Sequence, residues 1–160
     1  MWRISRLIDR FSAGWLAFLS LLIFIAFVVF VLPAESAKAA EASRGTESPD
    51  TSFLYSPNDL YRMAEEFGAV GRAAYVRARF SFDIIWPLVY TFFLLTTTSW
   101  AIGKVFPTQS RWRYLNLAPL PALLFDYLEN GSAALVMVRY PQTTAVFDWL
   151  APMATVLKWV

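Results

Sequence analysis

Cysteine and histidine are both absent from the 160-residue sequence. Without cysteine, the chain cannot form a disulfide, a thiol nucleophile or a thiolate metal ligand. Without histidine, it lacks the most frequent general base, the usual zinc ligand and the side chain that ordinarily titrates near pH ~6.5. Acid–base chemistry would have to come from carboxylates, lysine or tyrosine, and we expect neither a metal nor another cofactor.

An excess of one charge sign is also lacking. The net charge is +2, and the 14 basic residues are dispersed along the chain. Because nucleic-acid binding depends on clustered Lys and Arg, we do not expect a nucleic-acid partner. Apolar residues are abundant instead, since 58% of the residues are hydrophobic and 18% are aromatic. Soluble domains are roughly 45–50% apolar, so this excess indicates that the lipid bilayer is a partner.

Four apolar stretches dominate the sequence. A helix needs about 20 such residues to cross about 30 Å of hydrocarbon. We predict membrane spans at about 15–32, 81–106, 115–138 and 143–160, the last of which is barely long enough unless it is tilted or continues further. A small-x-small sequence at 37–39 is also found in cleaved signal peptides, but the 18-residue apolar stretch before it is long for a signal and favours a retained anchor.

The segment between the first two spans is polar. Residues 34–55 begin rich in Ala, Ser and Glu, and we predict a flexible outer linker there. Ser56 and Asp59 then mark a helix start, which predicts an outer amphipathic helix over 56–80 that leads into the second span. The helix either lies on the bilayer surface or caps the bundle, and its acidic residues favour capping because anionic lipid would repel them. Its apolar residues recur at helical spacing: Leu60, Met63, Ala64 and Phe67.

These elements predict an all-α membrane protein, a four-transmembrane-helix bundle with an additional amphipathic helix in the outer loop, in one domain of residues 1–160. Basic residues near span ends favour the cytoplasmic side. They place both termini in the cytoplasm and the long loop outside, because they gather in the N-terminal segment and between the second and third spans: Arg3, Arg6, Arg10, Lys104, Arg111 and Arg113.

Several ionisable residues fall inside or near the predicted spans. Charges at hydrocarbon depth are costly, so they usually face the bundle interior. At about 100° per residue, Asp126, Glu129 and Asn130 share one side of the third helix. Helical rise places Lys158 near the level of Asp126, and we predict that Lys158 pairs with Asp126 or Glu129. Asp148 lies near the outer end of the fourth span.

A longer polar stripe follows the second helix. Arg72, Tyr75, Arg79, Asp83 and Tyr90 lie on one face if the helix continues from the outer loop into the membrane. Arg79 and Asp83 are four residues apart and can pair. The stripe and the intramembrane acids predict either an outward-facing polar cavity between the second, third and fourth helices, or a structural network that only holds the helices together.

Two segments of the sequence have a distinctive pattern. They are Tyr55-Ser56-Pro57, Leu60-Tyr61, Gly68, Gly71-Arg72, Tyr75, Arg79, Asp83 and Trp86-Pro87-Leu88-Val89-Tyr90 in the first, and Phe125-Asp126-Tyr127-Leu128-Glu129-Asn130 in the second. Together they resemble a family of small, uncharacterised bacterial four-helix inner-membrane proteins, and the resemblance covers about half of the chain. It implies a bacterial inner (plasma) membrane and a four-helix arrangement, and it carries over no catalytic residue because no activity is known for that family.

Three functions are compatible with this pattern, and whether the chain is an enzyme stays open. The first is binding or transport of a small cationic or amphiphilic molecule against the intramembrane acids. The second is a lipid-modifying enzyme, in which Asp126 and Glu129 supply acid and base while Arg72 and Arg79 bind a head-group phosphate. The third is a structural subunit whose polar face meets another membrane protein.

Overall fold

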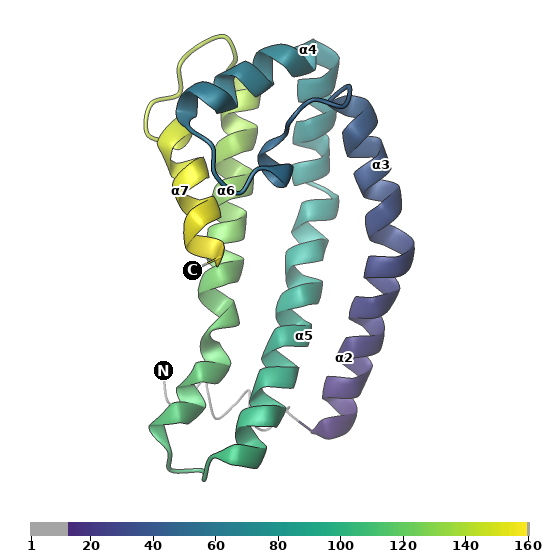
Figure 1. The fold of residues 1–160 in the computed structure, drawn as a ribbon, viewed down its shortest axis with the longest axis vertical. Coiled ribbons are helices and arrows are strands. Elements are labelled where there is room, and N and C mark those ends of the chain that lie inside the picture. Colours follow the sequence, from purple (N-terminus) through teal and green to yellow (C-terminus); the bar gives the residue numbers. More distant parts are fainter. Residues whose placement is uncertain (1–12, 160) are drawn as a thin grey trace.

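The computed structural model describes residues 13–159, which are all-helical and contain no strand within that range. The predicted all-α class is confirmed, while Arg3, Arg6, Arg10 and Val160 lie outside the described residues. Figure 1 shows long helices side by side, with α4 crossing one end. The elements are α2 (Gly14–Ala26), η1 (Phe27–Val31), α3 (Leu32–Ala42), η2 (Pro49–Thr51), α4 (Pro57–Arg79), α5 (Phe82–Val105), η3 (Arg111–Leu117), α6 (Pro119–Arg139) and α7 (Phe147–Trp159).

Two helical stretches are long and apolar enough to cross a membrane. One runs from Gly14 to Ala42, and the other runs from Pro57 to Val105 and comprises α4 and α5. The first exposes large apolar side chains along its length, with Trp15 68% and Phe30 76% exposed. Because extended exposed apolar patches are rare on proteins surrounded by water, this face requires an apolar environment or an apolar partner.

The first helix extends beyond its apolar sequence. α3 continues to Ala42 because alanine has the highest helix propensity, and Glu35 and Lys38 form an ion pair of 2.7 Å along it. Pro33 does not end the helix, because it lies in the first turn of α3, directly after the π-helical turn η1, where a missing N–H group is tolerated. The prediction of a flexible linker over 34–55 is therefore wrong for residues 34–42.

α4 caps one end of the molecule and then turns toward α5 (Figure 1). The turn is at Gly68, whose φ of 62° and ψ of 179° are accessible essentially only to glycine. Ser56 caps the helix, since its side chain accepts from the Asp59 N–H while Asp59 accepts from the Ser56 N–H. The predicted capping role is confirmed, because the apolar residues of α4 are buried against α6 and α7: Leu60, Met63, Ala64 and Phe67 pack with Ala133, Val136, Met137 and Ala151.

Small and hydroxyl-bearing side chains bring the long helices together. Ser20 of α2 and Thr96 of α5 share a hydrogen bond of 2.6 Å. Phe24 stacks on Phe93 with the ring centroids 4.7 Å apart. α6 and α7 pack along one another, and buried alanines on both helices permit their close approach: Ala133, Ala134, Ala151 and Ala154.

The fourth predicted span is shorter than expected. α7 begins only at Phe147, because Val146 has a φ of 76°, a left-handed conformation that cannot belong to the helix. The 13 residues of α7 rise about 20 Å, which is less than the roughly 30 Å that a complete span requires. α7 ends partway along α6 (Figure 1), so within the described residues it is shorter than the predicted span over 143–160.

Candidate functional site

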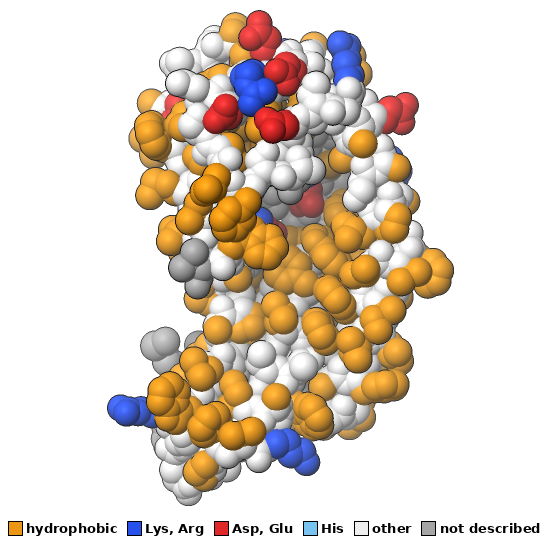
Figure 2. Space-filling model, viewed as in Figure 1, with side chains coloured by type: hydrophobic (Ala, Val, Ile, Leu, Met, Phe, Trp, Pro, Cys, Tyr) orange, Lys and Arg blue, Asp and Glu red, His pale blue; other side chains and the backbone are white. Residues whose placement is uncertain are grey.

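A cavity of about 1300 Å³ lies beneath the cap. Its walls come from α3, the loop of residues 43–51, the second half of α4, the start of α5, the middle of α6 and the last turn of α7. Figure 2 shows a hollow on this face of the molecule, with acidic and basic side chains at its depth. The surface below the hollow is mainly hydrophobic, so the cavity joins a charged interior to an apolar exterior.

The last turn of α7 places an ammonium group between two carboxylates of α6. Lys158 Nζ lies 2.8 Å from Asp126 Oδ1 and 2.6 Å from Glu129 Oε2. Asp126 and Glu129 lie on one face of α6 and are only 7% and 3% exposed. The predicted pairing of Lys158 with Asp126 or Glu129 is confirmed, and Lys158 contacts both acids.

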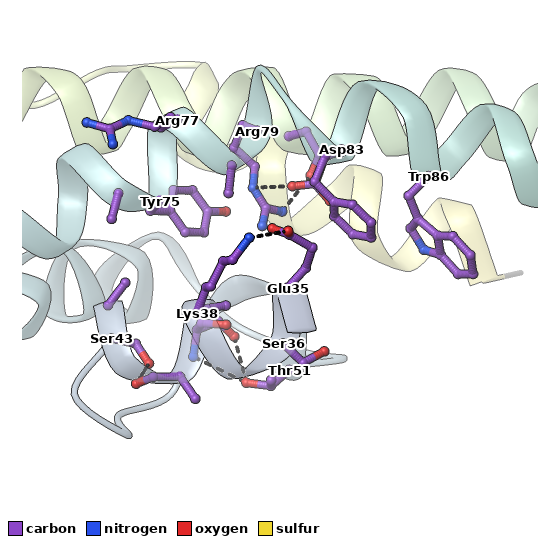
Figure 3. Close-up of a pocket in the computed structure, with 18 of the residues that line it drawn as sticks. Glu35, Ser36, Lys38, Ser43, Thr51, Tyr75, Arg77, Arg79, Asp83 and Trp86 are labelled. Atoms are coloured by element: carbon purple, nitrogen blue, oxygen red, sulfur yellow. Dashed lines mark hydrogen bonds and ion pairs between the residues drawn. The ribbon is translucent and has the colours of Figure 1, made fainter. Parts of the chain in front are cut away.

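A second ion pair lines the cavity where α4 meets α5. Arg79 Nε lies 2.9 Å from Asp83 Oδ2, and Arg79 Nη1 donates to Asn130 Oδ1 over 3.1 Å. The guanidinium carbon also lies 4.5 Å from the centroid of the Tyr75 ring, and Figure 3 shows Arg79 between Tyr75 and Asp83. Partners on α4, α5 and α6 therefore hold the Arg79 side chain in place.

Among the described residues that line the cavity, the charges do not balance. Its buried floor has three carboxylates, from Asp83, Asp126 and Glu129, against two cations, from Arg79 and Lys158. The rim leaves this excess of one negative charge unchanged, because its two acids match its two bases. Since a charge removed from water is costly unless it is paired, the floor favours one further cation. The rim residues are Glu35, Glu47, Lys38 and Arg77.

The wall that α3 contributes was missed by sequence reasoning. Glu35 and Lys38 line the cavity, and Figure 3 shows them opposite Arg79 and Asp83. The prediction of a linker over 34–42 leaves both residues out of the site, although the Ala-rich run with Glu and Lys three residues apart is typical of a helix. Aromatic rings complete the wall: Phe67, Phe82, Trp86 and Trp159.

Two predicted site residues lie outside the cavity. Arg72 follows the turn at Gly68, and its side chain reaches back to the first half of α4, where it donates to the Ala64 carbonyl oxygen over 2.7 Å. Its guanidinium carbon also lies 4.7 Å from the centroid of the Tyr140 ring. Asp148 accepts a hydrogen bond of 3.2 Å from the Tyr61 hydroxyl, because the start of α7 lies against the cap. The structure therefore does not bring Arg72 and Asp148 into the cavity with the other predicted site residues.

The remaining candidates lie in or beside the cavity. Tyr90 does not line it, and its hydroxyl is buried beside the cavity. The predicted residues that the cavity does bring together come from α4, α5, α6 and α7: Tyr75, Arg79, Asp83, Asp126, Glu129, Asn130 and Lys158.

The arrangement is suited to holding a cation. Two-carboxylate hydrolases keep their acids about 5–9 Å apart around a substrate and a water molecule. Here one ammonium group contacts both Asp126 and Glu129, which makes both carboxylates hydrogen-bond acceptors. Within residues 13–159, no group of three or more Asp or Glu residues is placed to hold a metal ion.

Comparison with protein-family models, curated proteins and solved structures found no match.

Proposed function

We propose that this chain is an integral protein of the bacterial inner (plasma) membrane whose outward-facing cavity binds a small amphiphile with a cationic head group. Two long apolar helices and an exposed apolar face along the first of them support membrane insertion. The resemblance of the residues around Tyr55 to Tyr90 and Phe125 to Asn130 to small bacterial inner-membrane proteins supports the location.

The excess negative charge in the cavity floor is the observation on which this proposal rests. Asp83, Asp126 and Glu129 are each at least nine-tenths buried, and the basic side chains that face them among the described residues are those of Arg79 and Lys158. A cationic head group would complete the pairing. An attached alkyl chain could leave through the hollow and lie along the hydrophobic surface below it (Figure 2), where it would stay out of water.

Two alternative functions have less support. A lipid-modifying enzyme would use Asp126 and Glu129 as acid and base, but both carboxylates contact Lys158. Arg72 would bind a head-group phosphate in such an enzyme, but its side chain donates to the Ala64 carbonyl oxygen outside the cavity. A purely structural subunit would be expected to fill its interior with paired side chains. The cavity of about 1300 Å³ and its excess negative charge do not fit such a filled and fully paired interior.

Binding can be tested with three amphiphiles that share one alkyl chain and differ in head-group charge. The protein would be placed in phosphatidylcholine nanodiscs and titrated calorimetrically, below micellar concentrations, with dodecyltrimethylammonium, dodecyl sulfate and dodecyl maltoside. We expect saturable binding of the cation alone. Tighter binding of dodecyl sulfate than of the cation would contradict the proposal.

Matched variants locate the binding. Glu129→Gln removes the excess charge while leaving Lys158 its partner Asp126, and we expect it to weaken cation binding about tenfold, or 1.4 kcal/mol. Glu65→Gln removes a charge from the exposed face of α4, and it should leave the affinity unchanged. Equal effects of the two variants would show that the cation responds only to overall charge.

A further inference from the structure

The two basic side chains in the cavity floor are held in different ways. Arg79 is fixed by Asp83, by Asn130 and by the ring of Tyr75, which belong to three helices. Lys158 approaches its two carboxylates from the last turn of α7. A lysine ammonium is a compact charge on a flexible stem of four carbons, whereas the planar guanidinium is held in a defined orientation. Lys158 is therefore the base that can rearrange without disturbing the helices.

The contacts of Lys158 also describe the chemistry of the group that fits there. Distances of 2.8 and 2.6 Å to Asp126 and Glu129 are those of N–H donors to carboxylate oxygens. A primary ammonium has three such donors, so it can satisfy two carboxylates at once. A quaternary ammonium has no N–H group, and its methyl groups keep the nitrogen further from the oxygens.

We propose that the Asp126–Glu129 pair is a primary-ammonium site, which Lys158 occupies in this structure and shares with the amine of the incoming amphiphile. This inference rests on the proposed cation-binding function and specifies its ligand as a long-chain primary amine or an aminolipid head group. On binding, Lys158 keeps one carboxylate and the ligand ammonium takes the other. Three carboxylates then face three cations, and the floor becomes neutral.

Sharing with Lys158 predicts a specific response to changes at that residue. Lys158→Gln removes the competing ammonium, so dodecylammonium should bind the variant about tenfold more tightly than it binds the unmodified protein. Lys158→Arg provides a planar fork that engages carboxylates bidentately, so it should weaken dodecylammonium binding about tenfold. The opposite directions of the two effects separate competition from a general loss of structure.

The experiment compares dodecylammonium with dodecyltrimethylammonium in nanodiscs, by calorimetry and by the ligand-induced rise in melting temperature. We expect the primary amine to bind the unmodified protein at least tenfold more tightly than the quaternary amine. The Lys158→Gln variant is also a test if it is unfolded in the absence of ligand. Recovery of its folded state by dodecylammonium, but not by dodecyltrimethylammonium, supports the shared site. Failure of dodecylammonium to restore the fold overturns it.

The outcomes distinguish this inference from the function on which it rests. If both amines bind equally well and Lys158→Gln changes neither affinity, the cation-binding cavity remains and the primary-ammonium site is overturned. If neither amine binds more tightly than dodecyl sulfate, the proposed function itself is wrong and the inference fails with it.

Discussion

Gly71 lies where α4 passes the end of α3. A methyl group added there would lie 2.5 Å from the Ala42 carbonyl oxygen and 3.1 Å from Phe67 Cβ. Because backbone atoms cannot give way as a flexible side chain can, we expect Gly71→Ala to lower the free energy of unfolding by about 1–3 kcal/mol. Thermal unfolding of the purified protein measures this loss.

Gly131 provides the matched control, since it is also helical but nothing lies within 4 Å of an added Cβ. Gly131→Ala should be neutral, or stabilising by about 0.5–1 kcal/mol, because alanine is the better helix former. Similar losses of stability in Gly71→Ala and Gly131→Ala would show that the close approach of α3 to α4 is not the cause of the effect at Gly71.

The cluster of Lys158, Asp126 and Glu129 makes a second prediction at the residue scale. Lys158→Met leaves two buried carboxylates without their cation, and we expect a loss of about 3–5 kcal/mol. Glu129→Gln leaves Lys158 paired with Asp126, a pair with no net charge, and should lower the free energy of unfolding clearly less. The charge-swapped double variant Asp126→Lys/Lys158→Asp should recover part of the stability lost in each single variant, as measured by thermal unfolding. Additive losses in the double variant would mean that the groups are not coupled.

The N-terminus of α4 is a pH-dependent element. The side-chain hydrogen bond from Ser56, followed by its backbone hydrogen bond and Arg62, lowers the pKa of Asp59 below its ordinary value of 3.8. A lowered folded-state pKa means that the contribution of Asp59 is fully present above its unfolded value and is lost as the pH falls through the folded value. We therefore expect the first half of α4 to lose order on acidification, below about pH 4.

Hydrogen exchange of the α4 amides, followed by mass spectrometry at decreasing pH, measures this loss. Asp59→Asn should remove its pH dependence, whereas Glu41→Gln, at an exposed position of α3 outside the capping box, is the control. An unchanged acid response in Asp59→Asn would contradict the assignment of this effect to Asp59.

Elements with local signals were predicted well from the sequence, and elements set by tertiary contacts were not. The start of α4 follows from Ser56 and Asp59, and its buried face follows from spacing alone. The pairing of Lys158 with the acids of α6 also follows from spacing, because helical rise fixes relative depth. The late start of α7 depends on the backbone of Val146, which no residue pattern encodes. The placement of Asp148 depends on Tyr61, 87 residues earlier in the chain.

At the scale of the whole molecule, the two ends differ in charge. At the cap, Arg62 forms ion pairs with Glu47, Asp59 and Glu66. Figure 2 shows that acidic and basic side chains gather at the top of the molecule. The opposite end has basic side chains, among them Lys104, Arg111 and Arg113 around the α5–η3 connection. An apolar surface separates the ends (Figure 2). This distribution fits the proposed orientation, with the cap and cavity facing outward and the basic end in the cytoplasm.

The absence of cysteine makes that orientation directly testable, because every introduced thiol is unique. Asn58→Cys lies on the exposed start of α4 and should react with a membrane-impermeant maleimide in intact spheroplasts. Thr108→Cys lies in the exposed connection after α5 and should react only after the membrane is opened. Leu22→Cys lies on the exposed face of α2, where the proposed bilayer excludes water, and should react in neither state because maleimide requires a hydrated thiolate. Labelling of Thr108→Cys from outside would reverse the orientation, and rapid labelling of Leu22→Cys would place the apolar face of α2 in water, which would remove the physical basis for an amphiphile-binding cavity that opens toward lipid.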